Sequence, residues 1–466
     1  MKGREQKISE DNFPYDDRAA LKSSVGVQTF LWINETEATE GIVNIGLLEQ
    51  ILSPLNLNAA YKQVVSNRGS YGIDKMGVKE LKTYLIANKT VLLSQILTGK
   101  YRPHPVLRVE IPKEGGKKRE LGIPTVIDRL LQQAIHQVLT PLYECQFSPN
   151  SYGFRPCRNA HGALKQVQSW VDLGYRYVVD LDLEKYFDTI NRSKLIEILS
   201  RTIKDGRVIS LIHKFLNAGV MVGERVEEFG QGVPQGSPLS PLLGNIMLHE
   251  LDKELTLRGH KFVRYADDVM ILCKSRRSAE RTLTNTVSFI EKKLYLRVNK
   301  DKTSVSDISE IKYLGYGFYF RDEKCRFRVH PKSWEKMQEK IKEITSRSNG
   351  KGDAWRKSKL GEYIRGWVNY FKMADMKSKL LKLDGWYRRR LRMVIWKQWK
   401  SVKTRFVNLQ KLGTYRQKAW EHANTRKSYW HTAQSWILTT TITNERLKKA
   451  GYIFFSDYYE KVAPLN

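Results

Sequence analysis

The spacing of apolar residues predicts helices at the start of the chain and a strand hairpin after them. Apolar residues three and four positions apart predict a helix over Leu47 to Val65, with a break at Pro54. Alternating residues predict a strand over Val106 to Ile111, and Gly115-Gly116 supplies a turn before the chain returns over 117–122. This pattern predicts a basic two-stranded hairpin.

Further along, short apolar strands alternate with long helices. Strand patterns cover Arg176 to Leu183 and Phe262 to Leu272, and helical patterns cover roughly 192–216 and 238–255. After about Pro331 the strand signals vanish, and three helices rich in Lys, Arg and Trp are expected at 334–347, 355–374 and 378–399. The order predicts an α+β domain followed by a basic helical module.

Charge narrows the class of partner. The chain has 466 residues, with 80 Lys and Arg against 49 acidic residues, a net charge of +31 and a pI near 9.8. Such an excess favours a polyanionic partner, and the interleaved tyrosines and tryptophans suit stacking on nucleotides. No apolar window is long enough to span a membrane. The four cysteines are far apart, which favours a reducing, cytoplasmic compartment over a disulfide framework.

Paired aspartates interrupt the second apolar strand. Asp267 and Asp268 occupy the middle of Phe262 to Leu272, where hydrophobic residues are expected. If the chain makes a tight hairpin turn there, divalent cations could neutralise both. The segment 176–190 offers a third carboxylate, either Asp182 or Asp180. Three carboxylates holding two magnesium ions roughly 3.5–4 Å apart would activate a primer hydroxyl and stabilise leaving pyrophosphate.

These segments resemble the palm motifs of reverse transcriptases. Tyr265-Ala-Asp-Asp268 is similar to the family's tyrosine-x-Asp-Asp motif, and 176–190 is similar to its first palm motif. In that family an aromatic residue five positions after the metal-binding aspartate screens the sugar 2′-OH, which here is Phe187. The resemblance therefore selects Asp182, with Asp267 and Asp268, as catalytic and metal-binding residues, and Leu183 as a further metal ligand.

The same resemblance implies a nucleotide site. The run from Gln231 to Pro241 resembles the second palm motif, in which Gln235 and Gly236 let the backbone approach the nucleotide and template. On the predicted hairpin, Lys113 and Arg119 resemble the pair that grips the incoming triphosphate. In the fourth palm motif, Lys302 is the candidate that aids pyrophosphate departure, with Lys300 as the alternative. Tyr313 to Phe320 resembles the primer-grip hairpin.

Flanking motifs resemble the group II intron branch of the family. Asn67 to Asp74 and Ser148 to Pro156 look like its extended N-terminal and fingers regions, and Gly361 to Phe371 with 386–399 looks like its maturase thumb, domain X. Cys157 departs from the glycine expected after Arg-Pro. The residues that we expect to contact nucleic acid are Arg68, Tyr71, Arg155, Arg158, Arg388, Arg389 and Arg390.

The resemblance implies a right-hand polymerase with an α-helical thumb. We expect an N-terminal extension at 1–60, fingers and palm at 61–325, thumb and domain X at 326–425, and a tail at 426–466 that contributes to DNA binding. The expected function is an RNA-directed DNA polymerase and intron maturase with two Mg²⁺ ions. Its expected partners are group II intron RNA, a template with a DNA primer, dNTPs and a DNA target, with no membrane and with the choice between monomer and dimer open. The alternatives are a reverse transcriptase of repair or defence and a non-catalytic RNA-binding splicing factor.

Overall fold

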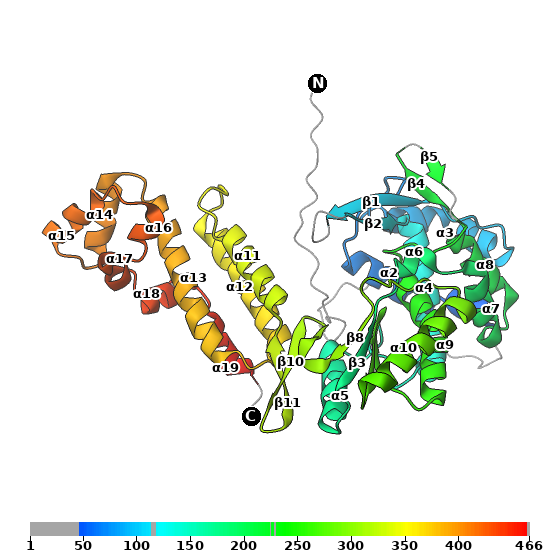
Figure 1. Cartoon of the computed structure of the whole chain (residues 1–466). Helices are drawn as coiled ribbons and strands as arrows, with labels where there is room; N and C mark the ends of the chain where they lie inside the picture. Colours follow the sequence, from blue (N-terminus) through cyan, green and yellow to red (C-terminus); the bar gives the residue numbers. More distant parts are fainter. Residues whose placement is uncertain (1–45, 113–117, 224, 228–229, 464–466) are drawn as a thin grey trace. The chain divides into compact units, whose positions relative to one another are not determined.

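The computed structural model describes residues 46–112, 118–223, 225–227 and 230–463 (Figure 1). The chain forms two compact units that meet in sequence at Ser306 and Asp307. Lys113 and the predicted turn at Gly115-Gly116 lie outside the described residues. Within the described ranges, no helix is both long and apolar enough to cross a membrane.

The first unit begins with a helical layer. The predicted break is confirmed, because α1 ends at Ile51 and α2 begins at Pro54, where the Ser53 hydroxyl accepts a hydrogen bond from the Asn56 amide. Helix α4 packs on α2 and buries a continuous apolar stripe. The helices of this layer are α1 (Leu47–Ile51), α2 (Pro54–Ser66), α3 (Leu81–Leu97) and α4 (Val126–Glu144).

The predicted hairpin belongs to a four-stranded sheet in the order β2-β1-β4-β5. The hairpin strands β1 and β2 are antiparallel, with Leu107 opposite Ile123 and Pro112 opposite Lys118, while β1 pairs with β4 in parallel. Strands β4 and β5 were not predicted, because three-residue strands carry too little pattern. The strands are β1 (Val106–Pro112), β2 (Lys118–Ile123), β4 (Val220–Val222) and β5 (Arg225–Glu227).

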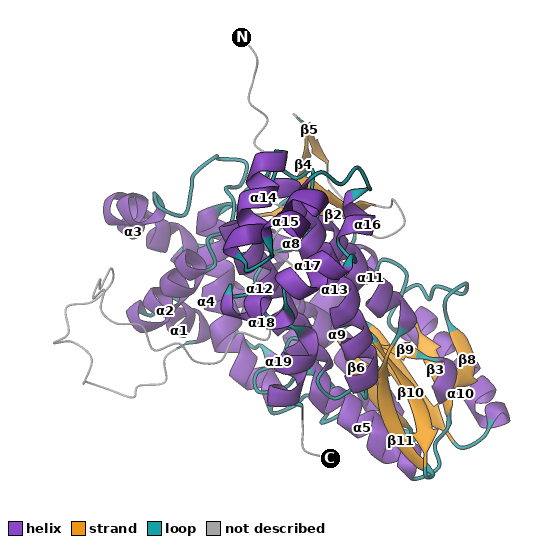
Figure 2. Ribbon diagram, turned by 90° about the vertical axis from the view of Figure 1, so that its left-hand side faces the viewer, coloured by secondary structure: helices purple, strands orange, loops and turns teal. Residues whose placement is uncertain are grey.

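The palm is a second sheet, in the order β6-β7-β3-β8. Counted along the chain this order is 2-3-1-4, as in ferredoxin-like folds. Helix α5 contacts β6, and α10 contacts β3 and β7 (Figure 2). The elements are α5 (Ala160–Asp172), β3 (Tyr177–Leu181), β6 (Lys261–Tyr265), β7 (Asp268–Cys273), α10 (Arg276–Lys293) and β8 (Ser304–Asp307).

Helix α9 forms the centre of this unit's core. Most of its residues are buried, including Leu243, Met247 and Leu251, so it is apolar on nearly all sides. The helices of this part of the unit are α6 (Tyr186–Thr189), α7 (Arg192–Thr202), α8 (Gly206–Leu216) and α9 (Ser240–Leu257).

The second unit starts with a small sheet and continues as helices. The sheet, in the order β11-β10-β9, contains the predicted Tyr313 to Phe320 segment, which the predicted boundary at 325 had assigned to the palm. Its elements are η3 (Ile308–Glu310), β9 (Lys312–Tyr313), β10 (Tyr316–Arg321) and β11 (Lys324–Val329). The α+β class with a helical thumb is confirmed.

Three long helices follow, close to their predicted ranges. Trp367 and Phe371 are buried with ring centroids 4.8 Å apart, as expected for helix packing rather than nucleotide stacking. In the tail, short helices pack along α13, with α19 near one end and α16 near the other (Figure 1). The helices are α11 (Pro331–Ile344), α12 (Asp353–Phe371), α13 (Lys377–Gln398), α14 (Val402–Lys411), α15 (Arg416–Ala423), α16 (Tyr429–Thr432), α17 (Trp436–Thr441), α18 (Asn444–Lys449) and α19 (Phe455–Val462).

Candidate active site

The paired aspartates lie at a tight turn between two strands. Tyr265 of β6 pairs with Asp268 of β7, so Ala266 and Asp267 form a two-residue hairpin loop. Ala266 has a φ of +57°, whereas Asp267 is not among the residues with positive φ. This pattern matches a type II′ turn, which favours glycine at its first position. The turn therefore stores backbone strain next to the acids.

Strand register brings the third carboxylate to them. In the antiparallel pair of β3 and β7, Asp180 lies opposite Met270 and Leu181 opposite Val269. Continuing the register by one residue places Asp182 opposite Asp268. Residues directly opposite in such a pair project to the same face. Asp182 is therefore the acid next to the turn, while Asp180 lies two pairs further along the ladder.

The acids are close enough to perturb one another. Burial, together with the negative charges of Asp267, Asp180 and Asp182, raises the pKa of Asp268 to about 7. Burial and the charge of Asp182 raise the pKa of Asp180 to about 6. Such mutual repulsion is expected where carboxylates gather to bind cations, because a cation would remove it.

Lys302 supplies one positive charge at this site. Its amino group donates to Asp182 Oδ2 at 2.9 Å, and the Asn299 amide donates to the Asp182 carbonyl at 2.9 Å. The loop of the predicted fourth palm motif is thus fastened to the end of β3. Between the two candidate lysines, Lys302 is the one that the structure places against a predicted metal ligand.

The described residues contain no group of three acidic, histidine or cysteine side chains that could hold a metal ion as they stand. The chemistry of the donors nevertheless fits a divalent cation, since carboxylate oxygens are hard ligands and the neighbouring carboxylates raise the pKa of Asp268. Leu183 is buried and pairs with Val298 across an isolated bridge, so it could offer only its backbone carbonyl.

Phe187 is fixed in place by the second palm motif. The Val233 amide donates to the Phe187 carbonyl at 2.7 Å, and the Gly232 amide donates to the Ile190 carbonyl at 2.8 Å. A Cβ on Gly244 would lie 3.1 Å from the Phe187 ring, so this glycine makes room for it. Phe187 is 9% exposed, and the bond from Val233 and the close approach of Gly244 fix its position, as a steric barrier requires.

The same loop contacts the fingers sheet. Gly236 has a φ of +110°, and a Cβ there would lie 2.9 Å from the Gly122 carbonyl of β2. Arg119 Nε donates to Gln235 Oε1 at 2.8 Å. The structure therefore brings together three of the residues predicted from separate motifs to contact the nucleotide.

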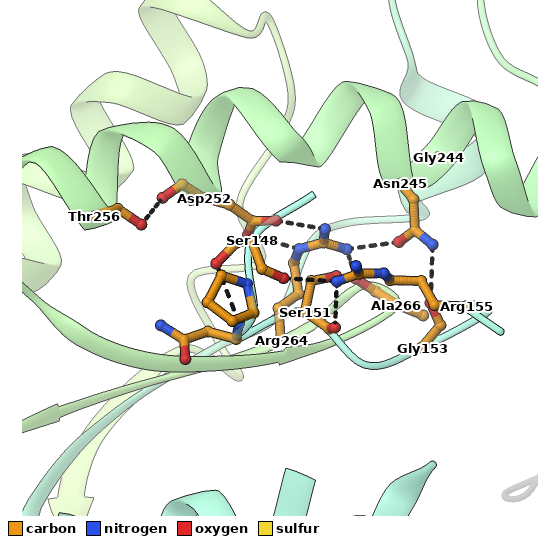
Figure 3. A network of polar contacts seen from close by, with 12 residues as sticks. Ser148, Ser151, Gly153, Arg155, Gly244, Asn245, Asp252, Thr256, Arg264 and Ala266 are labelled. Carbon is orange, nitrogen blue, oxygen red and sulfur yellow. Dashed lines mark hydrogen bonds and ion pairs between the residues drawn. The ribbon is translucent and has the colours of Figure 1, made fainter. Parts of the chain in front are cut away.

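A buried arginine clamps the aspartate turn (Figure 3). Arg264 and Asp252 both have fully buried side chains and form a two-armed ion pair at 2.6 and 2.8 Å. Arg264 Nη1 also donates to Asn245 Oδ1 at 2.8 Å and to the Ala266 carbonyl at 3.0 Å. This last bond holds the strained residue immediately before Asp267.

The clamp extends to the loop of the predicted fingers motif. Asn245 Nδ2 donates to the Gly153 carbonyl at 2.8 Å, and a Cβ on Gly153 would clash with the backbone of Ala266. Sequence reasoning missed Arg264, Asp252 and Asn245. A charged residue within the apolar run Phe262-Val-Arg-Tyr was the available signal, because a buried charge needs a partner.

One predicted nucleic-acid contact is wrong. The side chain of Arg155 is 2% exposed, and its guanidinium donates to the Glu144 carboxylate and to the carbonyls of Ser148 and Ser151. Figure 3 shows the Arg155 guanidinium directed at Ser148 and Ser151 of its own loop. A guanidinium whose donors are all directed at internal acceptors has none left for a phosphate.

The other predicted contacts differ in how far they are available. Arg68 and Tyr71 are exposed. Arg158 donates to the Pro149 carbonyl at 2.7 Å and lies over the Tyr152 ring. For these three residues the nucleic-acid contact stays a prediction.

The arginines of α13 also have internal partners. Arg388 lies 5.6 Å from the Phe454 ring centroid. Arg389 donates to the Trp430 carbonyl, and Arg390 donates to Thr345 Oγ1 at 2.6 Å and to the Lys342 carbonyl at 3.1 Å. Arg389 and Arg390 therefore join helices within the unit, and their contact with nucleic acid stays a prediction.

A palm sheet with acids at a strand turn, a glycine-rich nucleotide loop and a basic helical unit together define a nucleic-acid polymerase. Residues 111–318 match the reverse transcriptase (RNA-dependent DNA polymerase) family, and residues 334–413 match the group II intron maturase-specific domain. The chain belongs to the reverse transcriptase family, in the branch that carries the group II intron maturase domain. This family generally uses divalent metal ions, and both domains imply RNA binding.

The chain is similar to several known proteins. Protein YkfC of Escherichia coli (strain K12) is 32% identical over 304 residues, which cover 57% of this chain and 80% of YkfC. The group II intron-encoded protein LtrA of Lactococcus lactis subsp. cremoris is 37% identical over 221 residues, which cover 47% of this chain and 36% of LtrA. A chain of a solved partial Cas6-RT-Cas1–Cas2 complex is 27% identical, covering 53% of this chain and 43% of that chain, with a TM-score of 0.36.

Proposed function

We propose that this protein copies an RNA template into DNA from a DNA primer, and that its helical unit binds group II intron RNA to assist splicing and retrohoming. The observation that carries the polymerase proposal is the strand register. Leu181 lies opposite Val269 at the end of the ladder, so the next residue, Asp182, follows beside the turn that carries Asp267 and Asp268, within the segment that matches the reverse transcriptase family.

We assign two Mg²⁺ ions to Asp182, Asp267 and Asp268, with the backbone carbonyl of Leu183 as a further ligand. When bound, such ions lower the barrier by polarising the primer hydroxyl and neutralising charge on the transferred phosphoryl group. The chain's own residues bind and orient the deoxynucleotide.

Four residues define the nucleotide's surroundings. Arg119 and Gln235 already contact each other and face the triphosphate side in this proposal. Phe187, held by the Val233 amide, excludes a sugar 2′-OH by steric contact. Lys302 donates a hydrogen bond to the leaving pyrophosphate in this proposal.

Primer extension tests the proposal directly. With an RNA template, a DNA primer, deoxynucleotides and Mg²⁺, we expect the wild type to extend the primer and Asp267→Ala to fail. Asp322→Ala removes an exposed acid from the β10–β11 turn and should retain activity, which controls for lost charge. A wild type that extends no primer over a range of salt would overturn the polymerase proposal and favour a non-catalytic splicing factor.

Sugar selection provides a second test. Phe187→Ala should relax discrimination against ribonucleotides by removing the steric wall. Its melting temperature must be measured alongside, because truncating a buried phenylalanine costs roughly 3–5 kcal/mol. Unchanged ribonucleotide discrimination in a folded Phe187→Ala variant would contradict the assigned role.

A further inference from the structure

Three cations surround one aromatic ring in the helical unit. Arg347, Lys397 and Arg405 lie 5.3, 5.2 and 6.0 Å from the ring centroid of Tyr429. They come from the segment after α11, the end of α13 and α14, while Tyr429 begins α16. We call these four residues the Tyr429 cluster. Its members come from segments that are up to 82 residues apart (429 minus 347).

This charge is not neutralised locally. Within the described part of the chain, none of the three cations forms an ion pair with a carboxylate. From Gly385 to Asn444 the sequence contains 13 Lys and Arg but a single acid, Glu421, which pairs with Lys418. Like charges held this close repel one another, so their arrangement favours an anionic ligand.

The cluster is held by a rigid frame. Arg405 Nε donates to the Trp399 carbonyl at 3.0 Å, and its guanidinium lies 4.9 Å from the Trp396 ring. Next to Tyr429, Trp430 is fixed because Arg389 lies 3.9 Å from its ring and donates to its carbonyl. The frame orders Tyr429 and Arg405 before any ligand arrives, which lowers the entropic cost of binding.

Exposure distinguishes the cluster from its neighbours. Arg347 and Lys397 are exposed, and no hydrogen bond within the described chain occupies them. Arg389 and Arg390, by contrast, direct donors at carbonyl groups. The exposed cations Arg347 and Lys397 can therefore reach a ligand, whereas the sequence had suggested the run of Arg388, Arg389 and Arg390.

We propose that the Tyr429 cluster binds the phosphodiester backbone of RNA. Three cations around one point suit consecutive phosphates. RNA is favoured over DNA because all three cations lie within 334–413, the segment that matches the maturase-specific domain. The inference rests on the proposed maturase function and deepens it by naming the contact residues.

Salt dependence of binding provides the test. Each phosphate neutralised contributes about 0.7 to 0.9 to the slope of log K against log salt, so Arg347→Gln, Lys397→Gln and Arg405→Gln combined should lower the slope by about 2 to 3. The matched control replaces Lys324, Lys379 and Lys382 by glutamine, which removes the same charge from exposed positions in the same unit. The probe is a structured RNA transcript, titrated in parallel with a DNA duplex.

A milder variant protects the test from misfolding. Arg347→Gln with Lys397→Gln leaves the Arg405 frame intact and should lower the slope on RNA by about 1.5. A slope change equal to that of the control would overturn the inference. A loss confined to the DNA duplex would overturn the choice of RNA.

Primer extension on a short template keeps the two proposals separate. The cluster variants should extend such a primer like the wild type while binding the structured RNA more weakly. If the wild type extends primers but the variants keep their full salt slope, this inference fails and the polymerase proposal stands. If the wild type binds the RNA through the cluster but extends no primer, the polymerase proposal fails instead.

Discussion

Two basic sites, one in each unit, use their charge in opposite ways. In the palm, Arg264 is fully buried, paired with Asp252 and directed at the backbone of the aspartate turn. In the helical unit, the cations around Tyr429 are unpaired, and two of the three are exposed. A buried paired charge fixes geometry, whereas an exposed unpaired one attracts a ligand. A basic residue therefore positions the active site in one region and is available for binding in the other. Its partners decide which of the two roles it has.

Breaking the buried pair should have the largest effect. Arg264→Met leaves Asp252 buried without a partner, so we expect a loss of about 3–5 kcal/mol in unfolding free energy. The aspartate turn also loses its clamp, so primer extension should fall by about 100-fold in the folded fraction. Urea unfolding and single-turnover extension measure the two quantities.

A double variant separates positioning from stability. Arg264→Met with Asp252→Leu removes both charges and should regain much of the lost stability. Its polymerase activity should stay low, because the bond to the Ala266 carbonyl is still missing. Recovery of activity together with stability would show that the clamp is merely structural.

The second prediction concerns the loop that covers the turn. Gly153→Ala places a Cβ against the backbone of Ala266, and neither side can move without disturbing the bond from Asn245. We expect a loss of about 1–3 kcal/mol and at least ten-fold slower extension. Gly162→Ala is the control, since its Cβ would meet only the edge of the Tyr152 ring at 3.2 Å. Equal activity in both variants would contradict a close contact at the turn.

A third substitution sharpens the contrast within the helical unit. Arg390→Gln removes hydrogen bonds to Thr345 and to the Lys342 carbonyl at the end of α11, so the unit should lose about 1–2 kcal/mol. The slope of RNA binding against salt should barely change, unlike that of the Tyr429 cluster variants. A slope loss without destabilisation would instead make Arg390 a direct RNA contact.

The smallest expected effect at neutral pH comes from His249, which should give stability a pH dependence. This side chain is buried in α9 against Phe147, and burial lowers its pKa to about 4. Its pKa is lower in the folded than in the unfolded state, so the unfolded state binds more protons and stability falls as pH drops from about 6.5 towards 4. His249→Gln should flatten this part of the curve of unfolding free energy against pH. An unchanged slope would show that a group other than His249 causes the pH dependence of stability.

Much of the site was predictable because its motifs are local. The paired aspartates stand out because they interrupt an apolar strand, and the helices of the second unit follow from their apolar periodicity. The roles of Phe187 and of the glycine-rich loop follow from the resemblance of their motifs to those of reverse transcriptases. The prediction for Arg155 failed because a basic residue in a loop looks the same in sequence whether it faces solvent or Glu144. The short strands β4 and β5 were missed because their pairing, rather than their pattern, defines them.

By itself the sequence determined the class of chemistry, since acids within an apolar strand, a glycine-rich turn and a large positive charge each have a physical meaning without a fold. Only the tertiary structure decided which charges are available. Asp252 and Arg264 are 12 residues apart and pair inside the first unit, while Arg347, from the segment after α11, and Tyr429 of α16 are brought together across the helical unit. Availability depends on burial and on partners distant in sequence, and those are fixed by packing rather than by local pattern.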